Sequence, residues 1–159
     1  MTAKPTIIGR AEQIQLADYD NQLITAKVDT GADISSIWAS NVMEEDGTLS
    51  FVLFGSASPY FTGETVRLKH PQYRLTWIAN SFGTREQRYV VKLRIRINGR
   101  TIKALFSLAD RSSKTYPILL GRRLLNKKFL VDVSRGKALM DKEKAKRRKL
   151  HISLGQEEG

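Results

Sequence analysis

The clearest regular pattern of the chain runs from Val91 to Ile97. Apolar residues at every second position alternate there with two arginines and a lysine, which is the two-residue period of a half-buried strand. Asn98-Gly99 follows directly, and this dipeptide favours a tight two-residue hairpin turn. The pattern therefore predicts one antiparallel hairpin over Val90–Ala109.

Shorter apolar or alternating stretches predict further strands, and two segments favour helix. Gly121–Asn126 suits one or two helical turns, and Ala138–His151 is rich in helix formers with a favourable Glu143–Arg147 pair four residues apart. We find no internal repeats and no Pro-rich linker. We expect one all-β domain over residues 1–137 and a charged C-terminal extension over 138–159. The other expected strands are Thr6–Ala17 with a bend at Gly9, Leu23–Val28, Ser50–Phe54, Thr65–Lys69, Tyr73–Ala79 and Pro117–Leu120.

Length and composition narrow the class of protein. A chain of 159 residues suits a single domain with a sizeable core. The absence of cysteine excludes disulfides, thiolate metal sites and a cysteine nucleophile. Met1–Pro5 contains no apolar run of a signal peptide, and no segment approaches the roughly 18 apolar residues of a membrane span. We therefore expect a soluble, cytoplasmic protein.

The chain carries a formal net charge of +11. The tail from Asp141 onward holds six basic and four acidic residues, so it adds only +2 and the body carries the remaining +9. A basic surface favours acidic partners such as anionic peptides, acidic proteins or nucleic acid. The basic residues in and after the hairpin form either a solvated face or a patch for an acidic peptide or RNA: Lys92, Arg94, Arg96, Arg100, Lys103, Arg122, Arg123, Lys127 and Lys128.

Two short motifs suggest chemistry. After Lys27-Val28 the chain reads Asp29-Thr30-Gly31-Ala32-Asp33, so an apolar strand ends in an aspartate and a turn of small residues. Glycine in such a turn takes backbone angles that other residues resist. Downstream, an apolar triplet over 118–120 is followed by Gly121-Arg122.

These two motifs, in this order, resemble those of retropepsin-like aspartic peptidases. The resemblance covers about residues 22–133 and includes a Gly-bearing flap, here Asn80–Thr84, before the long hairpin. Residues 40–72 resemble an insertion, with an extra hairpin around Phe54–Glu64. The resemblance implies a small closed β-barrel of the acid-protease type with one short helix.

A closer resemblance is to a bacterial and archaeal family labelled ATP-dependent zinc proteases. It rests on Ala-Lys-Val-Asp-Thr-Gly-Ala, on Arg85-Glu86-Gln87-Arg88, and on Leu-Leu-Gly-Arg-Arg followed by Phe129–Asp132. That family is retropepsin-like and is associated with ATP-grasp ligases that add glutamates to ribosomal protein, which implies such a ligase as a partner. The sequence contains no His-Glu-x-x-His helix and no Gly-rich phosphate loop, and its only histidines, His70 and His151, are far apart. We therefore expect no metal and no cofactor.

Aspartic peptidases need two neighbouring carboxylates that share one proton. The ionised carboxylate activates water, and the protonated one polarises the scissile carbonyl group. The chain has a single Asp-Thr-Gly motif, so the hypothesis requires a homodimer in which Asp29 meets its symmetry mate. The resemblance implies that Thr30 braces the two loops across the dimer, while Gly31 allows their close approach.

The resemblance also implies roles for residues around the catalytic loop. Ala32 and Asp33 would bind substrate or brace the loop, and Asp33 would pair with Arg122, in a bidentate arrangement if the geometry allows. Gly83 would lie near the tip of the flap, which closes over substrate.

Three functional hypotheses remain open at this point. The first is a homodimeric aspartic endopeptidase, with an acidic or glutamate-rich peptide as substrate. The second is a catalytically silent peptide-binding or regulatory module of the same fold that partners an ATP-grasp ligase. The third is a basic RNA- or ribosome-associated protein.

Overall fold

The computed structural model describes residues 4–80 and 82–157, and the side chains up to residue 155. The first residues of the N-terminal segment, Ser81 of the expected flap and Glu158 of the tail lie outside the described residues.

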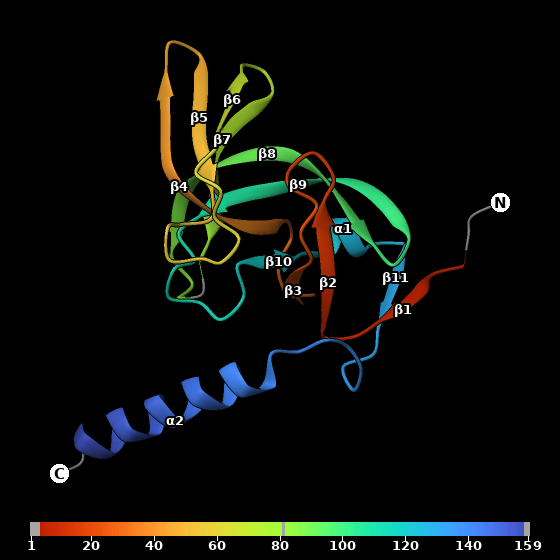
Figure 1. Cartoon of the computed structure of the whole chain (residues 1–159), viewed down its shortest axis with the longest axis vertical. Coiled ribbons are helices and arrows are strands. Elements are labelled where there is room, and N and C mark those ends of the chain that lie inside the picture. Colours follow the sequence, from red (N-terminus) through yellow and green to blue (C-terminus); the bar gives the residue numbers. More distant parts are fainter. Residues whose placement is uncertain (1–3, 81, 158–159) are drawn as a thin grey trace.

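Six strands form a closed barrel, as Figure 1 shows. Around the barrel the strands follow the order β10-β3-β2-β8-β9-β4, and β4 pairs again with β10. This ring confirms the small all-β barrel expected from the sequence. Its strands are β2 (Ala11–Leu16), β3 (Ile24–Val28), β4 (Ser35–Glu45), β8 (Arg85–Ile97), β9 (Arg100–Ala109) and β10 (Ile118–Leu120).

The β8–β9 hairpin confirms the strongest sequence signal. Asn98 and Gly99 form its turn with φ angles of 47° and 74°, the left-handed conformation that a two-residue hairpin turn requires. The apolar residues at every second position of β8 are buried, and the basic residues between them are exposed. The strand begins five residues before the expected start, at Arg85.

The predicted insertion extends one side of the barrel. β4 runs beyond the ring and pairs with β5 (Thr48–Leu53), which pairs in turn with β6 (Thr65–Lys69). The extra hairpin therefore has β5 and β6 as its arms and residues 54–64 as its connection. The sequence pattern did not reveal β4, because the strand begins with two buried serines, Ser35 and Ser36, and its second half is exposed.

The core fills the barrel, and short elements cover its ends. Phe51 and Phe106 are the largest fully buried side chains. The short helix α1 (Arg122–Leu125) buries its two leucines against the core. Outside the ring, β7 (Tyr73–Ala79) pairs with β8, and β1 (Thr6–Ile8) pairs with β11 (Phe129–Val131).

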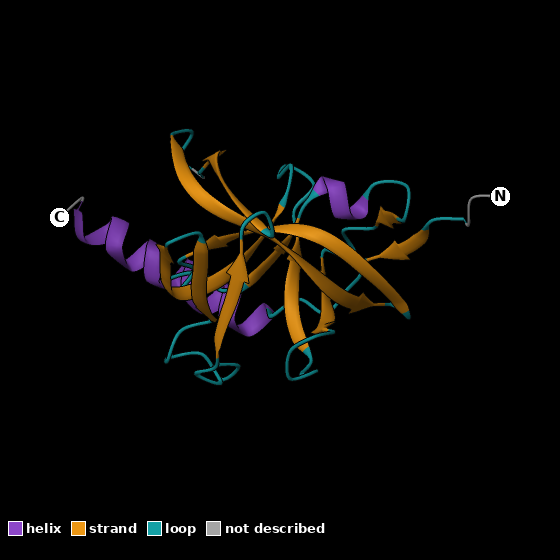
Figure 2. Ribbon diagram, turned by 90° about the horizontal axis from the view of Figure 1, so that it is seen from above, coloured by secondary structure: helices purple, strands orange, loops and turns teal. Residues whose placement is uncertain are grey.

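The C-terminal helix α2 (Met140–Glu157) extends away from the barrel in both views (Figures 1 and 2). It starts two residues later than expected and continues six residues beyond the expected end. Within residues 4–80 and 82–157, no helix has the length and apolar character needed to span a membrane.

Candidate active site

The two sequence motifs lie side by side in the fold. The backbone N–H of Asp29, at the end of β3, donates to the carbonyl of Leu120 at 2.9 Å. Arg122 N–H donates to the carbonyl of Ala32 at 2.8 Å. β10 lies between β3 and β4, parallel to the first and antiparallel to the second. The aspartate loop is therefore held by the apolar-Gly-Arg segment.

Gly121 allows this close approach. A Cβ atom at this position would lie 2.5 Å from the carbonyl carbon of Ile34 and 2.6 Å from its oxygen. The Gly121 N–H also donates to the buried Ser35 Oγ at 3.0 Å. A side chain at residue 121 would thus push apart the two segments that form the site.

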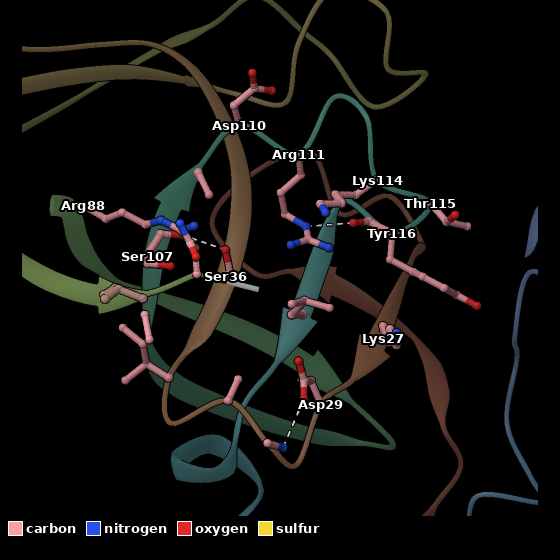
Figure 3. Close-up of a pocket in the computed structure, with 18 of the residues that line it drawn as sticks. Lys27, Asp29, Ser36, Arg88, Ser107, Asp110, Arg111, Lys114, Thr115 and Tyr116 are labelled. Atoms are coloured by element: carbon pink, nitrogen blue, oxygen red, sulfur yellow. Dashed lines mark hydrogen bonds between the residues drawn. The ribbon is translucent and has the colours of Figure 1, made fainter. Parts of the chain in front are cut away.

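Asp29 is half-buried, while Thr30 and Gly31 are exposed at the tip of the loop. The Gly31 N–H donates to Asp29 Oδ1 at 3.0 Å (Figure 3), which orients the carboxylate. Among the residues that the structure describes, no second carboxylate forms a hydrogen bond with Asp29. The aspartate and the exposed loop tip are therefore accessible from outside the chain.

Asp33 forms its closest ion pair with a different arginine from the one expected. Arg123 contacts both of its oxygens, with Nη2–Oδ2 at 2.9 Å and Nε–Oδ1 at 3.2 Å. Arg122 Nη2 lies 3.7 Å from Asp33 Oδ1, and its Nη1 donates to the carbonyl of Gly31 at 3.1 Å. The expected pair of Asp33 with Arg122 is therefore present as a long ion pair, while the bidentate contact is made by Arg123. Because α1 begins at Arg122, both arginines reach this loop.

The expected flap is the hairpin of β7 and β8. Gly83 lies in its turn with a φ of +80°, next to the hydrogen bond from Asn80 N–H to Thr84 O at 2.7 Å. The last residues of β7 and Asn80, over 78–80, form part of the wall of a cavity above Asp29. Gly83 itself lies beyond this wall.

The cavity has a volume of about 970 Å³ and is lined by β3, the aspartate loop, the flap, the segment between β9 and β10, and α2. Figure 3 shows Asp29 pointing into it from one side. Basic side chains outnumber acidic ones in the wall, so the cavity favours an anionic ligand. The basic residues are Lys27, Arg88, Arg111, Lys114, Lys146 and Arg147, and the acidic ones are Asp29, Asp110 and Glu143.

Arg111 has the most perturbed environment in this wall. Its Nε–H donates to the carbonyl of Tyr116 at 2.8 Å, and its guanidinium group points toward the cavity (Figure 3). Burial, with a smaller contribution from the nearby Arg88, lowers its pKa to about 10, and Asp29 opposes the shift. No sequence pattern marks Arg111 as a functional residue, because it lies in an irregular segment without a motif.

A polar cluster attaches α2 to the cavity. Glu143 accepts two hydrogen bonds from Arg10, at 2.9 and 3.0 Å, and one from the Tyr116 hydroxyl at 2.6 Å. The hydrogen bonds from Arg10 and Tyr116 lower the pKa of Glu143, and burial raises the pKa of Tyr116. The Leu139 N–H donates to the same hydroxyl at 3.0 Å. This contact brings Lys146 and Arg147 of α2 to the cavity, which the sequence did not indicate.

The described residues contain no cluster of three or more histidine, cysteine, aspartate or glutamate side chains that could hold a metal ion. His70 instead packs edge-on against Tyr73, with ring centroids 6.0 Å apart. The zinc site that the family label suggests has no matching ligand set in this part of the chain.

Comparison with known proteins agrees with this geometry. Over residues 7–143 the chain matches the RimB-like family, described as retropepsin-like aspartic endopeptidase RimB. A probable alpha-L-glutamate ligase of Desulfotalea psychrophila is 30% identical over 129 residues, which is 79% of this chain and 28% of that protein. A probable alpha-L-glutamate ligase of Shewanella pealeana is 31% identical over 148 residues, which is 89% of this chain and 31% of that protein.

The chain thus spans less than a third of the length of these curated relatives. A crystal structure of a Legionella pneumophila protein of unknown function has a TM-score of 0.61 and 25% identity, and the match covers 82% of this chain and 95% of that one. From the family match and the joined aspartate and glycine motifs, we conclude that the chain belongs to the RimB-like family of retropepsin-like proteins.

Proposed function

We propose that the protein is an aspartic endopeptidase that acts as a homodimer, with one Asp29 from each protomer in the catalytic dyad. The observation that supports this most directly is the position of Asp29. Its carboxylate is oriented by Gly31, lines a large cavity, and lies beside the exposed Thr30. A second copy could supply the missing carboxylate across a two-fold axis.

In this proposal the two Asp29 carboxylates share one proton. The ionised carboxylate removes a proton from water, and the water oxygen bonds to the carbonyl carbon of the peptide. The protonated carboxylate donates its proton to the carbonyl oxygen. The carbon–nitrogen bond then breaks as the protonated carboxyl group gives its proton to the amine. One hydroxyl of the tetrahedral intermediate gives its proton to the other carboxylate, so the dyad again holds one shared proton. Thr30 braces the two loops, and the β7–β8 flap covers the peptide.

The charge of the cavity supports an acidic peptide as substrate. Six basic side chains lie in its wall against three acidic ones, so the potential there attracts carboxylates and raises their local concentration. Glutamate-rich peptides fit this potential better than neutral or basic ones.

A second candidate function is a silent peptide-binding or regulatory module that works beside a glutamate ligase. The observation in its favour is that relatives named as probable alpha-L-glutamate ligases contain a region similar to this chain within a much longer protein. Such a module would bind the acidic product of a ligase without cleaving it. The RNA- or ribosome-binding hypothesis remains a prediction from the exposed basic residues of β8.

The test compares wild-type protein with Asp29→Asn on a glutamate-rich peptide and a glutamine-matched peptide, with cleavage followed by mass spectrometry. We expect cleavage by the wild type and a loss of about 10²–10⁴-fold or more in the variant, because the dyad provides general acid–base catalysis. Asp46→Asn is the matched control, since Asp46 is an exposed turn residue outside the cavity.

Two results would argue against the homodimeric peptidase. Peptide binding without cleavage, unchanged in Asp29→Asn, would favour the silent module. Cleavage by a protein that sedimentation shows to be monomeric at the assay concentration would contradict the shared dyad.

A further inference from the structure

Arg111 is a partly buried cation that neither the dyad nor the aspartate loop uses. It lies in the segment between β9 and β10, and the bond from its Nε–H to Tyr116 O fixes the plane of its guanidinium group. Across residues 4–80 and 82–157 it forms no ion pair. Other arginines near the site do have partners: Arg88 pairs with Glu86, and Arg123 pairs with Asp33.

The charges around Arg111 do not compensate for its burial. Arg88 lies close enough to repel the Arg111 guanidinium and lowers its pKa. The carboxylate of Asp29 opposes this lowering of the pKa. Asp110, although adjacent in sequence, accepts a hydrogen bond from the Ser112 N–H at 2.9 Å and points away from Asp29 in Figure 3. A guanidinium removed from water without a carboxylate partner costs stability, and a ligand carboxylate in the cavity would offset that cost.

The position of this cation relates it to the proposed reaction. Arg111 and Asp29 point into the same cavity from different elements (Figure 3). A peptide whose scissile bond lies at Asp29 therefore presents a neighbouring side chain to the guanidinium group. The terminal nitrogens form a planar fork that matches a carboxylate in two parallel hydrogen bonds.

We propose that Arg111 is a specificity-determining residue, whose guanidinium binds the carboxylate of a glutamate or aspartate next to the scissile bond. This inference rests on the proposed function, which it deepens by naming the group that recognises the acidic substrate. Lys114 on the same segment, with Lys146 and Arg147 on α2, lines the cavity further along. These exposed side chains hold additional acidic residues of the peptide less rigidly.

A purely structural role for Arg111 makes a different prediction. In that case the guanidinium only braces the segment through Tyr116 O, and its loss would weaken binding of acidic and neutral peptides equally. A specificity role changes the preference for acidic over neutral peptides. The ratio between matched peptides therefore separates the two roles.

The experiment measures binding in the Asp29→Asn background, so that no peptide is cleaved. The probes are a fluorescein-labelled oligo-glutamate peptide and an oligo-glutamine peptide of the same length, followed by fluorescence anisotropy. Asp29→Asn is compared with the double variants that also carry Arg111→Gln, Arg111→Lys or Lys92→Gln. Lys92 is an exposed basic residue of β8 that does not line the cavity, and it serves as the control.

We expect Arg111→Gln to reduce the preference for oligo-glutamate by about 10- to 150-fold, because a hydrogen-bonded charged pair contributes about 1.5–3 kcal/mol. Arg111→Lys should retain part of the preference, and Lys92→Gln nearly all of it. Circular dichroism establishes whether each variant is folded. If Arg111→Gln does not fold, Arg111→Lys tests the proposal in its place.

An unchanged preference in Arg111→Gln, or in Arg111→Lys where only that variant folds, would overturn the proposal. An equal loss for both peptides would also overturn it and assign Arg111 a structural role. A separate cleavage assay with the wild type tests the proposed function independently of this inference. Cleavage with no dependence on Arg111 refutes the inference alone, whereas Arg111-dependent binding without cleavage refutes only the peptidase.

Discussion

Replacing Gly121 by alanine tests whether the two motifs of the site are held together as the structure indicates. The added Cβ atom would lie 2.5 and 2.6 Å from the carbonyl carbon and oxygen of Ile34, and 3.0 Å from the carbonyl oxygen of Ala32. Carbon atoms in contact lie about 3.5–4.0 Å apart. Because the obstacles are backbone atoms, no side chain can rotate to make room. The apolar-Gly-Arg segment and the aspartate loop must therefore separate by about 1 Å.

The magnitude follows from three contributions. Overpacking of this kind costs about 1–3 kcal/mol, and weakening the bond from Gly121 N–H to Ser35 Oγ costs about 1 kcal/mol more. The lower entropy of the unfolded alanine chain offsets up to about 1 kcal/mol. We expect Gly121→Ala to lower the free energy of unfolding by about 1–4 kcal/mol, measured by urea denaturation at a fixed protein concentration.

Hydrogen exchange provides a local measurement of the same effect. The Asp29 and Arg122 amides donate across the junction, to Leu120 O and Ala32 O, and should exchange faster in the variant. Gly155→Ala is the matched control, because nothing lies within 4 Å of the added Cβ on α2, where alanine favours helix. A Gly121→Ala protein with wild-type unfolding midpoint and wild-type exchange at both amides would refute the reasoning.

Three further predictions concern α2 and the core. Glu143→Gln should speed hydrogen exchange in the first turn of α2, because the neutral amide has only one oxygen to accept from the Arg10 guanidinium and accepts more weakly than a carboxylate. Acid should also speed hydrogen exchange in the first turn of α2. The folded-state pKa of Glu143 is below its ordinary value of 4.5. The stabilisation of α2 by the Glu143 carboxylate is therefore fully present above pH 4.5 and is lost as the pH falls through the folded-state pKa. Phe106→Ala should lower the free energy of unfolding by about 3–5 kcal/mol, because the ring is fully buried.

Each of these predictions has its own control. Glu45→Gln changes an exposed carboxylate outside the polar cluster and should leave exchange in α2 unchanged. Once intrinsic exchange rates are corrected, the pH response of α2 should be absent in Glu143→Gln; a response that persists would mean that another group holds the helix. Phe82→Ala removes a ring that is 87% exposed, and a cost equal to that of Phe106→Ala would contradict the assignment of the core.

Much of the barrel could be predicted from local patterns. The alternation of β8 and the Asn98-Gly99 turn determine a hairpin, because both the two-residue period and the left-handed turn are properties of neighbouring residues. The break at Gly9 likewise appeared where β1 ends and β2 begins. By contrast, β4 was missed because its buried Ser35 and Ser36 resemble surface residues, and the pairing of these residues with Phe106 and Ser107 of β9 outweighs that local preference.

The candidate site was predictable only as far as its motifs extend. The sequence identified Asp29, Thr30 and Gly31 as one loop and the Gly121-Arg122 segment as its partner, since each motif requires small residues at particular places. It did not distinguish Arg122 from Arg123 as the bidentate partner of Asp33. Adjacent arginines are equivalent in sequence, and the direction in which each leaves α1 separates them.

The sequence by itself thus determined the all-β class, the central hairpin and the family to which the chain belongs, because those signals are local in the chain. The tertiary structure alone decided what surrounds Asp29. Arg10 and Glu143 are 133 positions apart yet share two hydrogen bonds, and Arg111 reaches the cavity only because β9 and β10 pair with other strands. Such contacts depend on how the barrel closes and brings distant side chains together, and no local pattern encodes that geometry.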